Sequence, residues 1–134
     1  MICHGSPYDE DAYIFDELDA LKALETATRP VCLFGHTHVA IAFRRAPDRF
    51  ELAAGPGDTD AVVVPIEPDC RYLVNVGSVG QPRDGDSRAA AGIVDTSAGR
   101  IELYRVRYAV EQAQRKIRMV GLPDVLARRL ALGR

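Results

Sequence analysis

Apolar residues near the start of the chain recur at intervals of three and four, which is the spacing of a helix with one buried face. Acidic residues fill many of the positions between them. The spacing predicts a helix over 8–27, with Ser6 or Asp9 as its amino-terminal cap. The apolar positions that set this period are Ile14, Leu18, Leu21 and Leu24.

The middle of the chain consists of short apolar runs separated by turn residues. The unbroken run 31–34 predicts a strand buried on both faces, and the segments 90–95 and 100–108 predict a hairpin. Helical spacing returns near the end, over 109–120 and 123–132. The pattern therefore predicts an α/β fold with a mixed or mainly antiparallel sheet and flanking helices. Further strands are predicted over 39–45, 49–52, 61–66 and 71–76.

The composition narrows the class of protein. A chain of 134 residues is expected to form a single domain, 1–134, and 47% hydrophobic with 27% charged residues is typical of a globular protein. Seventeen basic and nineteen acidic residues give a net charge of −2, so we expect no binding to nucleic-acid duplexes. No apolar run reaches the roughly 18 residues of a membrane span. Three widely spaced cysteines favour a reducing compartment, and we expect a cytoplasmic protein.

The three histidines of the chain, His4, His36 and His38, all lie where a predicted strand meets a loop. His36 and His38 are two positions apart, so in extended backbone their side chains leave on the same side. Imidazole suits zinc, manganese, iron or nickel, and the spacing does not choose between these ions. The alternative is that a His-X-His pair is only polar decoration at the edge of a sheet.

A glycine-rich segment over 75–86 is the second candidate for chemistry. Its glycines let the backbone curl so that successive N–H groups point at an anion, and Arg83 could bind a phosphate with its forked guanidinium. The alternative is a well-turned connection in which Arg83 pairs with Asp84 or Asp86.

Three segments together carry a resemblance to a known family: HGSP at 4–7, GHTH at 35–38 and NVGSVGQPRDGD at 75–86. In order and separation they resemble the C-terminal half of a calcineurin-like metallophosphoesterase, of the small bacterial and archaeal phosphodiesterase type. The resemblance runs from Met1 to about Tyr108. It implies part of a four-layer α/β/β/α sandwich with two divalent metal ions at the strand ends.

The resemblance also implies roles for single residues. His4 and His36 would bind one metal ion and His38 the other, while Gly77, Ser78 and Arg83 would lie on the substrate side. The implied reaction is hydrolysis of a phosphate mono- or diester by metal-activated water. The substrate would be a phosphorylated small molecule or a nucleotide.

The chain departs from the family at its beginning. The family's Asp-X-His, Gly-Asp-X-X-Asp and Gly-Asn-His-Asp/Glu motifs are absent, and Asn75 follows GHTH, so it is not the family's asparagine ligand. Only three residues precede His4, which is short for a buried strand. We therefore expect Met1 to stand inside a longer ancestral sequence, and the catalytic residues to lie in a preceding half.

Two other functions stay open at the level of the sequence. One is a non-catalytic regulatory or partner-binding remnant of the fold. The other is a mononuclear three-histidine site with its own hydrolytic activity. Whatever the function, a half-sandwich would expose the apolar sheet face that its other half covers, so we expect that the chain can self-associate through that face.

Overall fold

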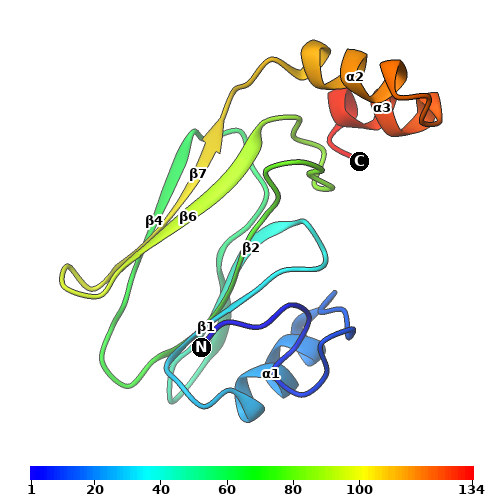
Figure 1. Ribbon diagram of the computed structural model, residues 1–134. Coiled ribbons are helices and arrows are strands. Elements are labelled where there is room, and N and C mark those ends of the chain that lie inside the picture. Colours follow the sequence, from blue (N-terminus) through cyan, green and yellow to red (C-terminus); the bar gives the residue numbers. More distant parts are fainter.

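A computed structural model describes all 134 residues of the chain. Seven strands and three helices confirm the α/β class predicted from the sequence (Figure 1). The elements in chain order are α1 (Glu17–Thr26), β1 (Val31–Phe34), β2 (Ala40–Arg45), β3 (Phe50–Ala54), β4 (Ala61–Pro65), β5 (Arg71–Val76), β6 (Ala89–Asp95), β7 (Arg100–Val106), α2 (Val110–Met119) and α3 (Asp124–Leu132).

The strands divide between two sheets. Four form a mixed sheet in the order β1-β5-β2-β3, in which β1 runs parallel to β5 and the other pairs are antiparallel. The remaining three form an antiparallel sheet in the order β4-β7-β6. The amino-terminal residues add a short bridge between Ile2 and Leu33 along the edge of β1. A mixed or mainly antiparallel arrangement is therefore confirmed, and it is split into two layers.

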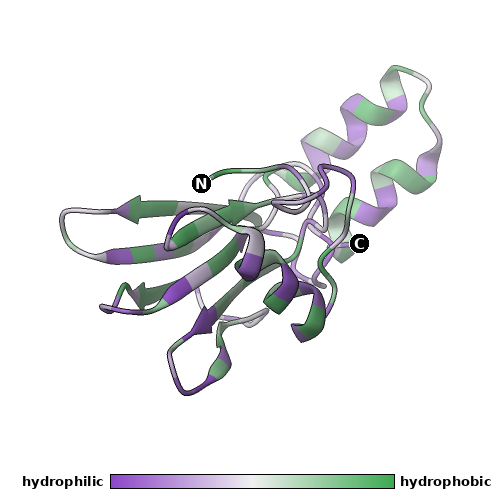
Figure 2. Ribbon diagram, turned by 90° about the horizontal axis from the view of Figure 1, so that it is seen from below, coloured by the Kyte–Doolittle hydropathy of each residue, from purple (hydrophilic) through white to green (hydrophobic).

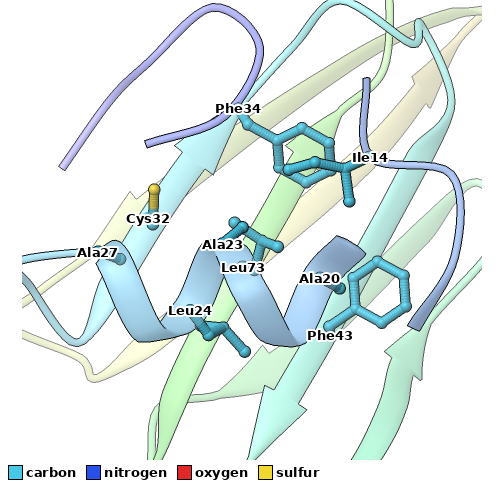
Figure 3. Close-up of a cluster of buried hydrophobic side chains, with 9 residues drawn as sticks. All are labelled: Ile14, Ala20, Ala23, Leu24, Ala27, Cys32, Phe34, Phe43 and Leu73. Carbon is cyan, nitrogen blue, oxygen red and sulfur yellow. The ribbon is translucent and has the colours of Figure 1, made fainter. Parts of the chain in front are cut away.

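Helix α1 covers one face of the four-stranded sheet (Figure 3). Its small residues at one face let it approach the strands closely, and Leu24 packs beside Leu73 of β5. Alternate residues of β1 face this cluster, while Val31 and Leu33 face the other sheet. The prediction that 31–34 is buried on both faces is confirmed. The cluster consists of Ile14, Ala20, Ala23, Leu24, Ala27, Cys32, Phe34, Phe43 and Leu73.

A second cluster fills the space between the two sheets. It combines Tyr72 and Val74 of β5 with Val64 of β4 and Ile101 of β7, all buried. The opposite face of the three-stranded sheet carries no helix (Figure 1), and Ile93 is exposed there. The chain thus supplies an α/β/β stack.

The first helix is shorter than predicted. The sequence predicts a helix over 8–27, whereas α1 begins at Glu17 and its cap is Asp16, which accepts a hydrogen bond from the backbone of Asp19. The reason is a turn at the proposed caps: Ser6 Oγ bonds both the backbone oxygen and the backbone nitrogen of Asp9. The turn diverts the chain, so the predicted caps Ser6 and Asp9 stabilise a loop.

The two carboxy-terminal helices agree with the prediction and form a hairpin. Helix α2 has no buried residue, and α3 buries Ala127 and Leu130. Figure 2 shows hydrophilic and hydrophobic segments alternating along this hairpin, which stands apart from the sheets. Gly133 joins it to the body of the protein, because its carbonyl accepts a 3.0 Å hydrogen bond from Gly85 N. None of the three helices has the length and apolar character needed to cross a membrane.

Candidate metal centre

His4 and His36 come together at the ends of two neighbouring parallel segments. His4 follows the residues that bridge to β1, and His36 follows β1 itself after Gly35. Gly35 N donates a 2.7 Å hydrogen bond to the His4 carbonyl, which fixes the two turns against each other. The ring centroids lie 4.6 Å apart with the planes at 61°. Two of the three predicted ligands are therefore in contact.

His36 and His38 do not lie in extended backbone as the sequence pattern suggested. Their φ angles are 66° and 60°, in the left-handed region that residues other than glycine seldom occupy. The chain turns sharply at this point, with Thr37 buried between the two histidines. Such backbone strain persists only where surrounding contacts hold it, and it gathers at functional sites.

Asn75 supplies those contacts. Its side chain is completely buried, and Nδ2 donates to the Gly35 carbonyl at 2.8 Å and to Thr37 Oγ1 at 2.9 Å. Its Oδ1 accepts a 2.8 Å bond from Gly77 N. One amide thus joins the histidine turn to the start of the glycine-rich segment. Sequence reasoning missed this role, although a lone asparagine in the apolar strand β5 was a usable signal.

His38 is fixed by the glycine-rich segment rather than by the other two histidines. Its Nδ1 lies 2.9 Å from the Gln81 carbonyl oxygen, and its own carbonyl accepts a bond from Arg83 N at 3.2 Å. An Nδ1–H that donates to this carbonyl leaves Nε2 with its lone pair, as in histidines that bind metals. Gln81, which the sequence analysis did not single out, is therefore a positioning residue for His38.

The predicted substrate-side residues occupy three different settings. Gly77 has φ of 86°, and a Cβ there would lie 2.5 Å from Ala90 Cβ, so glycine is required by packing. Ser78 Oγ accepts a 2.9 Å bond from Gln81 N and shapes the loop. Arg83 is exposed and donates to Gln81 Oε1 at 2.9 Å. The alternative pairing of Arg83 with Asp84 or Asp86 is wrong, because those carboxylates bind other arginines, Arg105 and Arg88.

An aromatic stack beside His36 was not foreseen. The centroid of the Tyr13 ring lies 3.9 Å from that of His36, and the Phe15 ring stacks on Tyr13 at 4.9 Å with the planes almost parallel. Tyr13 sits in the segment wrongly predicted as helix. A helical pattern gave no reason to expect it at the histidines, since only the turn at Ser6 and Asp9 brings it there.

Cys3, the neighbour of His4 in the sequence, lies beside a second thiol. Cys3 Sγ is 3.9 Å from Cys32 Sγ. Burial raises the pKa of Cys32 to about 12, and burial also raises the pKa of Cys3. Both thiols are therefore protonated near neutral pH while no metal ion is bound, and they form no cluster of three metal-ligating side chains with the histidines.

The donor set fits part of a metal centre. Two neighbouring imidazoles and a third with a free Nε2 are the donors that divalent transition metals accept. No group of three or more histidine, cysteine, aspartate or glutamate side chains lies close enough to hold an ion. Within this chain the ion would therefore be held by His4 and His36, without a carboxylate.

The comparisons with known proteins agree with the resemblance seen in the sequence. The crystal structure of a metallophosphoesterase from Sphaerobacter thermophilus matches with a TM-score of 0.88 and 35% identity, covering 99% of this chain and 55% of that one. The hypothetical protein PH1004 from Pyrococcus horikoshii OT3 matches with a TM-score of 0.68 and 15% identity, covering 96% of this chain and 44% of that one. No family model matches the chain.

A curated relative gives a further match over half of the chain. Uncharacterized protein MJ0912 of Methanocaldococcus jannaschii is 46% identical over 69 residues, which are 52% of this chain and 28% of the relative. The chain thus spans about half the length of the solved structures and little more than a quarter of this relative. The fold is metallophosphoesterase-like, and the predicted resemblance is confirmed at that level.

Proposed function

We propose that the chain provides part of the site of a metal-dependent phosphoesterase, which hydrolyses a phosphate mono- or diester with metal-activated water. The observation that carries the proposal is the contact of His4 with His36, whose ring centroids lie 4.6 Å apart. These residues come from separate segments of the chain, and the sequence resemblance had paired them as ligands of one ion. The metallophosphoesterase-like fold supports the same reading.

In this proposal, three histidines bind the metal ions and one arginine contacts the substrate. His4 and His36 hold one divalent ion through neutral imidazole nitrogens. His38, oriented by the Gln81 carbonyl, presents Nε2 to a second ion. When bound, the two ions lower the pKa of water and neutralise charge on the phosphate. Arg83 is exposed beside Gln81 and is the group that contacts a phosphate oxygen.

Metal binding by the chain alone tests the first step. Isothermal titration with Mn²⁺ or Zn²⁺ should show weak binding, because two imidazoles without a carboxylate are an incomplete ligand set. His36→Ala should abolish the binding heat, while Asp58→Ala, in an exposed loop on another part of the surface, should not change it. Undiminished binding in both His4→Ala and His36→Ala would contradict the proposal.

Hydrolysis tests the second step. The chain alone should cleave an aryl phosphodiester no faster than free metal, because one loosely held ion stabilises the transition state poorly. Fusing ahead of Met1 a segment that carries the three absent motifs should create activity, and His38→Ala should remove it again. Turnover by the unfused chain that disappears in His38→Ala would instead support the mononuclear three-histidine site.

A non-catalytic remnant remains the second candidate, and one observation favours it. No three metal-ligating side chains of the chain lie close together, so the described residues do not complete a centre. The fusion experiment separates the two functions, because a remnant would stay inactive when the absent motifs are supplied.

A further inference from the structure

Charge is distributed very unevenly between the two helical ends of the chain. Residues 8–27, which include α1, hold seven acidic residues and one basic residue, a net side-chain charge of −6. Residues 110–134, which include the hairpin of α2 and α3, hold two acidic and six basic residues, a net charge of +4. The overall charge of −2 conceals this asymmetry. Two surfaces that carry opposite net charges of this size attract each other.

The acidic end also exposes large apolar side chains. Phe15 is 75% exposed and Leu18 is 76% exposed, and both lie among exposed carboxylates. We call this exposed segment the acidic patch; it contains Tyr13, Phe15 and Leu18 and, next to them in the sequence, the exposed Asp11, Asp16 and Glu17. Carboxylates beside exposed apolar side chains favour a partner that is both basic and apolar.

The hairpin has that chemistry. Met119 is 85% exposed and Val120 is 71% exposed at the turn between its helices. Arg115 and Lys116 are exposed on α2 and form no ion pair, so their charge is available to a partner. We call the turn and these two cations the basic tip; its remaining exposed apolar residues are Leu122 and Val125.

The two surfaces of one molecule do not face each other. Figure 1 places α1 at the lower end of the molecule and the hairpin at the upper end. The two surfaces of one copy therefore do not meet, and a second copy of the chain offers each of them a surface of opposite charge. We propose that copies of this chain associate head to tail, with the basic tip of one copy docked on the acidic patch of the next.

A head-to-tail contact uses two different surfaces, so it generates rings or open chains rather than a two-fold dimer. Sedimentation velocity from micromolar to millimolar protein should show a mass that rises with concentration. Raising the salt from about 0.1 M to about 1 M should weaken the association, because it shortens the screening length from about 10 Å to about 3 Å. A monomer throughout this range overturns the proposal.

Charge reversal identifies the surfaces. The double variants Asp11→Lys/Glu17→Lys and Arg115→Glu/Lys116→Glu should each weaken self-association by more than about tenfold, since like charges would then meet. None of these four side chains makes a hydrogen bond or ion pair within the chain. The control Arg107→Glu reverses an exposed charge that stands between β7 and α2 in the sequence, outside both surfaces, and should leave association unchanged.

Mixing the two double variants is the decisive measurement. In the mixture each altered surface meets an oppositely charged one, so association should return to about the level of the unaltered chain. Loss of association by the hairpin variant alone would indicate a two-fold contact between hairpins and overturn the proposal. Loss by Ile93→Ser alone would assign the contact to the bare face of the three-stranded sheet, and would overturn it as well.

Discussion

The four-stranded sheet with α1 and the carboxy-terminal hairpin are held in place by different means. Three small or apolar residues of α1 are completely buried against the sheet, and both faces of that sheet are covered. Helix α2 buries nothing, and the hairpin meets the rest of the molecule at Gly133. Burial of apolar surface is the main source of stability. The buried sheet therefore holds the candidate metal centre rigidly. The hairpin contributes little to the core, so most of its surface stays exposed.

The histidine turns lie on the stable side of this comparison. Asn75 belongs to β5, the strand that pairs with β1 and β2 at the centre of the sheet. The left-handed backbone at His36 and His38 is strained, and an element of low stability would let this backbone return to an unstrained conformation. The rigid centre of the sheet carries the strain.

A large-to-small change in the sheet should have the largest effect on stability. Leu73 of β5 is completely buried in the cluster beneath α1, so Leu73→Ala should lower the free energy of unfolding by about 2–5 kcal/mol. The matched change in the hairpin, Leu132→Ala, removes an exposed side chain and should cost less than about 0.5 kcal/mol. Chemical denaturation measures both. Equal costs would mean that the two regions do not differ as proposed.

Detaching the hairpin should have an intermediate effect. Gly133 has φ of 62°, and a Cβ there would lie 2.5 Å from Asp86 N. Gly133→Ala should therefore cost about 1–3 kcal/mol, through backbone strain and lost contact with Asp86. Hydrogen exchange should speed up in α2 and α3 while the amides of β1 and β5 stay protected.

Gly121→Ala is the control for this measurement. Its φ of 75° is also left-handed, but no atom lies within 4 Å of the added Cβ. It should reproduce the backbone strain without loosening the hairpin. Faster exchange in β5 of the Gly133→Ala variant would show that hairpin and sheet unfold as one unit.

The regular elements could be predicted from the sequence, and the site only in part. The spacing of apolar residues and the positions of turn residues predicted every strand and both helices of the hairpin. These elements are predictable because burial of one or both faces determines where their apolar residues stand. The helix predicted over 8–27 begins too early. Ile14 is buried and fits the helical period, but it lies in a loop before α1. The motifs singled out His4 and His36 as candidate ligands, which stays a prediction. Their contact depends on pairing between segments some thirty residues apart, which local spacing does not encode.

The parts of the site that escaped prediction share a physical cause. Asn75, Gln81 and Tyr13 act through bonds or stacking to residues more than twenty positions away. The directions of the His36 and His38 side chains also cannot be predicted from their spacing, because the rule that residues two apart point the same way assumes extended backbone and both residues have positive φ. Only the three-dimensional arrangement shows that the Asn75 amide joins the turn at His36 to the start of the glycine-rich segment.

The smallest expected effect concerns the charge at the hairpin's anchor. The hydrogen bond from the largely buried Arg88 guanidinium holds the pKa of Asp86 below its usual value of 3.8. A carboxyl group whose pKa is lowered in the folded state stabilises that state above its unfolded pKa, and the contribution is lost as the pH falls through the folded value. Asp86→Asn should therefore lower the free energy of unfolding by on the order of 1 kcal/mol at neutral pH. The difference from the unaltered chain should shrink once the pH falls below about 4, and should vanish at still lower pH.

Denaturation curves from pH 7 down to the acid limit measure this difference in the free energy of unfolding. The exposed Asp48→Asn is a control that should show no pH-dependent difference. If the cost of Asp86→Asn were instead constant across the whole range, the carboxylate would contribute by shape rather than by charge. The hairpin's anchor would then rest on the packing of Gly133 alone.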